Sequence, residues 1–133
     1  MRVALEWESR FGVAPAITSV LSEFDAALLV GMTADEFSIG QQGVSAVRRG
    51  HDFLFRGVRY QVKANRPSGK PGSAVTMVAK AKNYDWDQLI WIHYTKHYEI
   101  FEAWLWPVGR YRREFDHLAR LAPTHMRQGE RIA

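Results

Sequence analysis

The chain contains no cysteine, and this absence excludes both disulfide bonds and thiolate zinc sites. It has no apolar run near the roughly 20 residues that span a bilayer, and no signal-peptide pattern at its start. Glycine-rich phosphate loops, GxSxG and HExxH are also absent, which argues against the enzyme classes that use them. We therefore expect no membrane partner and a cytoplasmic location.

The chain has enough hydrophobic residues to form the core of one domain over residues 1–133. Hydrophobic residues make up 47% of the chain and aromatic residues 13%, including five Trp. A chain of this length and composition can bury a core without cross-links. The net charge of +4 and the pI near 9.6 favour an anionic partner, with nucleic acid first.

The hydrophobic pattern predicts helices and strands in a mixed order. We expect helices at 16–31 and 109–122, and a short helix opened by a Thr33/Glu36 capping box. Strands are expected at 44–48, 51–64 (a hairpin), 88–94 and 98–106, with a loop at 65–73 and a helix or strand at 74–82. The fold class is therefore α/β or α+β, with a central mixed sheet of four to five strands flanked by helices.

The hairpin HDFLFRGVRYQVKAN carries the most informative pattern in the chain. If it turns at Arg56-Gly57, Asp52 lies opposite Gln61, and Lys63 is the diagonal neighbour on the same face. Metal-assisted phosphodiester hydrolysis needs hard oxygen ligands and a cation that serves the attacking water. Asp52, the Gln61 amide and the Val62 carbonyl supply such oxygens, and Lys63 supplies the cation. Mg²⁺ or Mn²⁺ is the expected cofactor.

The same polar face has a simpler interpretation, because a hairpin with Asp, Arg, Gln and Lys on one side is also typical of a solvated surface. The loop that follows favours a site. Its two prolines stiffen it, and it extends a basic track suited to phosphate contacts. The predicted nucleic-acid-binding residues are Arg59, Asn65, Arg66, Ser68, Lys70, Lys80 and Lys82.

Asp52, followed across a hairpin by Gln61-Val62-Lys63, resembles the core motif of the PD-(D/E)xK nuclease superfamily. The resemblance implies a restriction-endonuclease-like core over about residues 16–106 and DNA cleavage with Mg²⁺. Two departures stand out: His51 precedes Asp52 where the motif has Pro, and Gln61 replaces an acid. The Gln variant is known in restriction-type branches, and it leaves the site one negative charge short.

The resemblance also implies a carboxylate from the first core helix. Glu23 in the middle of the long helix is preferred, with Glu36 as the alternative. The predicted function is thus a metal-dependent DNA endonuclease. The alternatives are an inactive nuclease-fold protein that binds nucleic acid, or a module that binds a protein partner through strands 88–106. A homodimer that cuts both strands is compatible with the first hypothesis.

Overall fold

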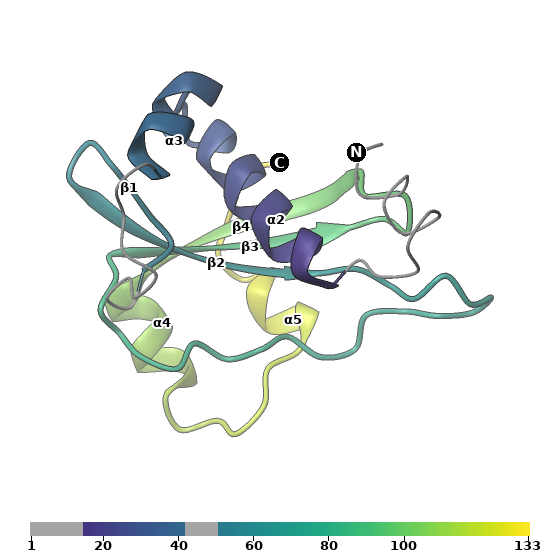
Figure 1. Ribbon diagram of the computed structural model, residues 1–133. Helices are drawn as coiled ribbons and strands as arrows, with labels where there is room; N and C mark the ends of the chain where they lie inside the picture. The colour runs from purple at the N-terminus through teal and green to yellow at the C-terminus, as the bar shows by residue number, and fades with distance from the viewer. Residues whose placement is uncertain (1–14, 42–50) are drawn as a thin grey trace.

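The computed structural model describes residues 15–41 and 51–133, which form helices around one sheet (Figure 1). The described helices are α2 (Pro15–Leu29), α3 (Ala34–Gln41), α4 (Val108–Phe115) and α5 (Pro123–Met126). The strands are β1 (Phe53–Phe55), β2 (Val58–Asn65), β3 (Gln88–Tyr94), β4 (Ile100–Pro107) and β5 (Glu130–Arg131). The strand expected at 44–48 lies outside the described residues.

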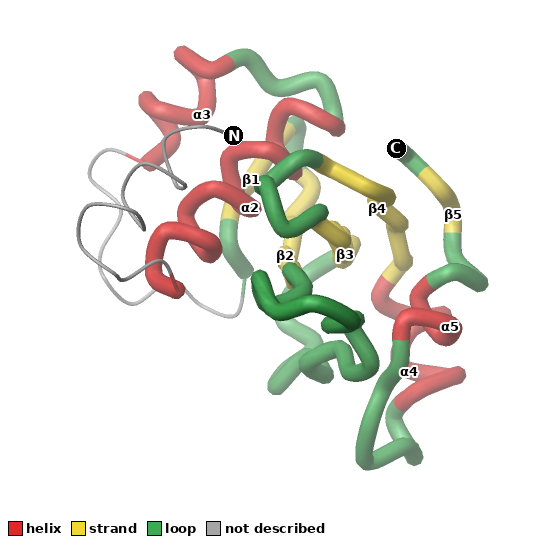
Figure 2. The backbone as a smooth tube through the Cα atoms, turned by 90° about the vertical axis from the view of Figure 1, so that its right-hand side faces the viewer, coloured by secondary structure: helices red, strands yellow, loops and turns green. Residues whose placement is uncertain are grey.

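The five strands form a single mixed sheet in the order β1-β2-β3-β4-β5. β2 and β3 run parallel, and the other neighbours are antiparallel. Helices cover both faces: α2 and α3 lie on one side, and α4 and α5 on the other (Figure 2). The fold is therefore α+β with a five-stranded mixed sheet flanked by helices, as the sequence predicts.

The connection between the parallel strands departs from one expectation. Residues 66–87 contain no helix, and they run beneath the sheet on the side of α4 and α5 (Figure 1). The helical option for 74–82 is therefore wrong. Val75, Thr76 and Val78 are β-branched and favour extended backbone. The Val78 N–H donates to the Leu121 carbonyl at 2.9 Å, which fixes the segment in an isolated bridge.

The C-terminal part is also rearranged relative to the prediction. The helix expected to reach residue 122 ends at Phe115, because Leu121 leaves the helical path to pair with Val78 and is buried. The chain then forms α5 and the short strand β5, which the sequence pattern did not indicate. β5 pairs with β4 and completes the edge of the sheet.

The sheet separates two hydrophobic cores of different character. The α2 side is mainly aliphatic, with some Phe and Tyr, and holds Ala26, Ala27, Met32, Phe53, Phe55, Tyr60, Val62, Ile90, Ile92, Tyr94, Ala103 and Leu105. The α4 side is rich in large aromatics and holds Val78, Ala81, Trp86, Leu89, Trp91, Trp106, Tyr111, Phe115, Leu121 and Met126. β3 contributes to both cores and is almost completely buried, as its continuous apolar run predicts.

Candidate functional site

The β1–β2 hairpin has the predicted turn and register. Arg56 and Gly57 both have positive φ, 50° and 79°, which is the conformation of a two-residue type I′ turn. The pairs Phe53–Tyr60, Leu54–Arg59 and Phe55–Val58 then follow as expected. Asp52 lies just before β1 and also faces Tyr60, because its N–H donates to the Tyr60 carbonyl at 2.7 Å. Asp52 and Phe53 thus share one partner, and the direct Asp52–Gln61 pair expected from the sequence is not among the pairs of this hairpin. The turn thereby brings Asp52 to the middle of β2.

The Asp52 carboxylate is held against the backbone of β2. Its Oδ2 accepts a hydrogen bond of 2.7 Å from the Val62 N–H. The N–H and C=O of one strand residue point toward the same neighbouring strand. The Val62 carbonyl therefore points to the side of β2 on which the Asp52 carboxylate lies. Two oxygens of the predicted metal set are thus brought to one edge of β2.

Gln61 and Lys63 lie on the opposite face of β2 from the buried residues Tyr60 and Val62, and both are half-buried. Burial lowers the pKa of the Lys63 ammonium, Asp52 raises it, and Lys82 lowers it further. Lys63 is therefore electrostatically coupled to Asp52, as the predicted site requires. A lysine that is partly desolvated beside a carboxylate is suited to orient water and to meet a phosphate.

The two helix carboxylates have different surroundings. Glu36 forms the predicted capping box: its Oε1 accepts the Thr33 N–H and its own N–H donates to Thr33 Oγ1, each at 3.0 Å. Glu23 is half-buried in α2. It stands three and four residues before Ala26 and Ala27, which are completely buried against the sheet. Glu23 therefore lies toward the packed side of its helix, on the face of the sheet opposite to the side chains of Gln61 and Lys63. Glu36 stabilises a helix terminus.

The acidic content of the site is low. Within residues 15–41 and 51–133, no group of three or more His, Cys, Asp or Glu side chains is arranged to hold a metal. Of the two predicted side-chain ligands in the hairpin, Asp52 is an acid and Gln61 is an uncharged amide. A metal at Asp52 would depend on the neutral oxygens of Gln61 and Val62 and on water.

Several residues predicted to contact nucleic acid have partners inside the chain. Arg59 forms an exposed ion pair with Asp87, with Nη2 and Oδ1 3.1 Å apart. The Arg66 guanidinium donates to the Lys96 carbonyl and lies 4.3 Å from the centre of the Tyr98 ring. These arginines attach β2 and the following loop to the segments around β3.

Asn65 and Lys80 also support the fold. The Asn65 side chain accepts from Trp91 Nε1 at 2.9 Å and donates to the Met77 carbonyl at 3.1 Å. Lys80 Nζ donates to the carbonyls of Asp116 and Leu118, just beyond the end of α4. A structural role is thus evident for both, whatever further contacts they make.

Ser68, Lys70 and Lys82 are exposed. Ser68 bonds to Ser73 across the loop, with the two hydroxyl oxygens 2.8 Å apart, so the loop is internally braced. Lys82 influences the pKa of Lys63 and is therefore close to the hairpin site. Of the predicted basic track, Lys70 and Lys82 present their ammonium groups to solvent most directly.

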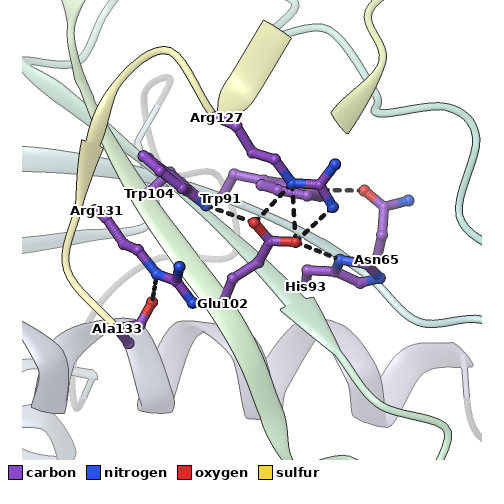
Figure 3. A network of polar contacts seen from close by, with 8 residues as sticks. All are labelled: Asn65, Trp91, His93, Glu102, Trp104, Arg127, Arg131 and Ala133. Atoms are coloured by element: carbon purple, nitrogen blue, oxygen red, sulfur yellow. Dashed lines mark hydrogen bonds and ion pairs between the residues drawn. The ribbon is translucent and has the colours of Figure 1, made fainter. Parts of the chain in front are cut away.

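Sequence reasoning did not identify a second polar cluster, centred on Glu102 of β4 (Figure 3). The Glu102 carboxylate is 3% exposed and accepts hydrogen bonds from Arg127 (2.6 Å), Trp104 Nε1 (2.7 Å) and His93, whose Nδ1 lies 2.9 Å away. Hydrogen bonds from Arg127, with those from His93 and Trp104, lower the pKa of Glu102 to about 2. The sequence shows His93 and Glu102 as polar residues within two largely apolar strands. Their contact could be predicted only with the register of β3 and β4, which pairs the two residues.

Neither a protein-family model nor a curated protein matches the chain. The superfamily resemblance of the hairpin therefore stays a prediction. In the described part of the chain, no helix combines the length and apolar character needed to cross a membrane.

Proposed function

We propose that this protein is a metal-dependent DNA endonuclease of the PD-(D/E)xK type. One observation carries the proposal: the hairpin holds the Asp52 carboxylate against Val62, and Lys63, whose pKa is lowered by burial, is coupled to that carboxylate. The basic character of the chain and the exposed Lys70 and Lys82 support a polyanionic substrate.

The donor set fits Mg²⁺ or Mn²⁺. Asp52, the Gln61 amide oxygen and the Val62 carbonyl are hard oxygen donors, which these cations prefer, and the small number of protein ligands leaves positions for water and phosphate. When bound, the cation would supply Lewis-acid stabilisation of the scissile phosphate. With one carboxylate in this set, binding should be weak. To add a second negative charge, Glu23 would have to reach the Asp52 end of the hairpin from the α2 side of the sheet.

Lys63 has two tasks in this proposal. Its ammonium donates hydrogen bonds that orient the attacking water, and it offsets the negative charge that grows on the phosphate oxygens. The partial burial of Lys63 strengthens both effects, because charges interact more strongly away from bulk water. The negative charge of Asp52 raises the pKa of Lys63 and so favours its ammonium form.

The direct test is incubation of plasmid and branched DNA with the protein and Mg²⁺ or Mn²⁺. We expect cleavage by the wild type, and loss of cleavage in Asp52→Asn and Lys63→Ala. Arg113→Ala is the control, because it removes an exposed positive charge from α4. Absence of cleavage by the wild type, or equal cleavage by Lys63→Ala, would reject the proposal.

Gln61 favours a second candidate, a nucleic-acid-binding protein without catalytic activity. The missing acid at this position weakens a metal site but leaves a basic surface intact. Salt-dependent DNA binding that is indifferent to divalent ions would support this candidate. Binding that requires Mg²⁺ or Mn²⁺ would favour the nuclease.

A homodimer is a further part of the nuclease proposal, because a two-fold pair of sites would cut both strands. Strands 88–106, suggested as an interface, lie inside the sheet, and most of their side chains are buried within the chain. Their largest exposed apolar group is Phe101. Analytical ultracentrifugation tests the dimer directly, and a monomer at tens of micromolar would count against it.

A further inference from the structure

An open cavity of about 630 Å³ lies beside the candidate nuclease site, at the carboxyl ends of the parallel strands β2 and β3. The loop 67–75 that follows β2 forms one wall. The end of β3, with Phe101 of β4 and Arg127 after α5, forms the other. Crevices at the carboxyl ends of parallel strands are common ligand sites, and this volume suits a small organic ligand.

The charges around the cavity favour an anionic ligand. Its lining, which consists entirely of described residues, includes Lys70, Lys96 and Arg127 and contains no Asp or Glu. The ion pair with Glu102 largely offsets the charge of Arg127. The exposed ammonium groups of Lys70 and Lys96 therefore provide most of the positive potential, one from each wall.

The cavity also offers a flat apolar surface. Phe101 is a large aromatic residue near the start of β4, where the β3–β4 register is irregular, and its side chain is 59% exposed. The His93 ring meets Phe101 edge to face, with the ring centres 5.3 Å apart. Because Glu102 engages Nδ1 of His93, Nε2 on the other side of the ring is the nitrogen with which His93 can meet a ligand. An exposed phenyl group with a fixed imidazole beside it suits a nucleobase.

The cavity is close to the candidate catalytic lysine. Lys63 and Asn65 are two residues apart on the same face of β2, and Asn65 pairs with His93 of β3. The strand rise and strand spacing place the backbones of Lys63 and His93 about 8 Å apart. A ligand in the cavity and a phosphate at Lys63 are therefore near enough to belong to neighbouring nucleotides.

We propose that this cavity receives one unpaired nucleotide of a DNA strand, next to the phosphate at Lys63. The base stacks on Phe101 beside His93, and the flanking phosphates lie between Lys70 and Lys96. The inference rests on the proposed function, because it names single-stranded or locally opened DNA as the substrate of the same site. Glu102 is a positioning residue here, since it orients His93 and Arg127.

The test is a binding titration without divalent metal, so that no cleavage is required. The probe is a thymidine oligonucleotide of about ten residues with one central 2-aminopurine, whose fluorescence falls when the base stacks. We expect the wild type to quench the probe and Phe101→Ala to bind at least about tenfold more weakly. Leu54→Ala, which truncates an exposed apolar residue outside the cavity, should bind like the wild type.

The charge contribution is measured by salt dependence. The double variant Lys70→Ala/Lys96→Ala should reduce the slope of log K against log salt by about 1.4, or about 0.7 for each phosphate that is no longer neutralised. Arg113→Ala should leave the slope unchanged. Unaltered quenching and affinity in Phe101→Ala, or an unaltered slope in the double variant, would overturn the proposal. So would 2-aminopurine nucleoside monophosphate that binds as tightly as the strand, because the cavity would then serve a free nucleotide.

The two proposals fail separately. If the wild type cleaves DNA but Phe101→Ala binds normally, the nuclease stands and the cavity assignment is rejected. If no DNA is cleaved under any condition but the quench depends on Phe101, the nuclease is rejected and the nucleotide site stands as part of a binding protein.

Discussion

Asp52 and Glu102 are two carboxylates beside the sheet, and their surroundings differ. Glu102 lies in the interior of β4, where a guanidinium, an imidazole and an indole N–H converge on it (Figure 3). Asp52 lies where the β1–β2 pairing ends, with its Oδ2 on the Val62 N–H and its charge coupled to Lys63. Glu102 is surrounded by three side-chain donors that fix it, whereas Asp52 accepts one backbone N–H and its charge acts on Lys63.

The two clusters also affect stability in opposite directions. The pKa of Glu102 is lowered to about 2, which means that the folded state favours its charge. The pKa of Lys63 is lowered as well, but for a base this means that the folded state disfavours the charge. The charge of Glu102 therefore stabilises the folded state, whereas the charge of Lys63 destabilises it. Such costs are typical of functional sites.

The largest expected effect comes from Lys63→Met. Cleavage of DNA should fall by at least about a hundredfold, the contribution of a positioned proton-transfer or charge-stabilising group. The melting temperature should stay the same or rise, because a desolvated ammonium is replaced by an apolar side chain of similar length. Gel assays of cleavage and calorimetry measure the two effects. A clear loss of stability would mean that Lys63 is a structural residue.

Glu102→Ala should have the opposite profile. We expect the free energy of unfolding to fall by about 3 kcal/mol, because Arg127, His93 and Trp104 lose a shared buried acceptor. Urea denaturation provides the measurement. Glu114→Ala is the control: its pair with Arg110 is a partly exposed i,i+4 contact, for which we expect about 0.5 kcal/mol or less. If both variants lose the same free energy of unfolding, the Glu102 cluster contributes no more to stability than an ordinary surface ion pair.

The pH dependence of stability gives a smaller and more specific effect. The Glu102 pKa falls from 4.5 to about 2 on folding, so its contribution is complete above pH 4.5 and is lost as the pH drops toward 2. We expect a loss of about 2 kcal/mol over this range, after allowing for the partial exposure of Arg127. Asp87 and Asp116 also have lowered pKa values, so the decisive quantity is the difference between wild type and Glu102→Gln. If both proteins lose stability in parallel, Glu102 is not responsible.

The two clusters also show which parts of the molecule the sequence could predict. The hairpin is local: the two-residue turn at Arg56-Gly57 and the alternation in β2 determine its register, and that register was predicted correctly. The Glu102 cluster joins β3, β4 and a segment beyond α5. The pairing of β3 with β4 brings His93 next to Glu102, and Arg127 joins them from a distant part of the sequence. Residue patterns within one short segment cannot predict such long-range contacts.

The segment 74–82 was ambiguous for a related reason. Its residues suited a short helix, while Val75, Thr76 and Val78 also suited a strand. The extended form is fixed by Leu121, which pairs with Val78 from a distant part of the chain. The same contact shortened α4. Local propensity thus allowed both a helix and an extended segment, and a long-range contact determined which of them forms.

The two candidate helix carboxylates, Glu23 and Glu36, give the smallest expected effect. Glu36→Ala should lower the free energy of unfolding by about 1 kcal/mol, because it removes half of the capping box. Thr33→Ala should cause a similar loss, and the double variant should lose less than the sum, since the two side chains act as one unit. Cleavage per folded molecule should be unchanged in Glu36→Ala and reduced in Glu23→Gln. If instead Glu36→Ala loses cleavage while Glu23→Gln retains it, the α3 carboxylate belongs to the site and the capping box forms only when DNA and metal are absent.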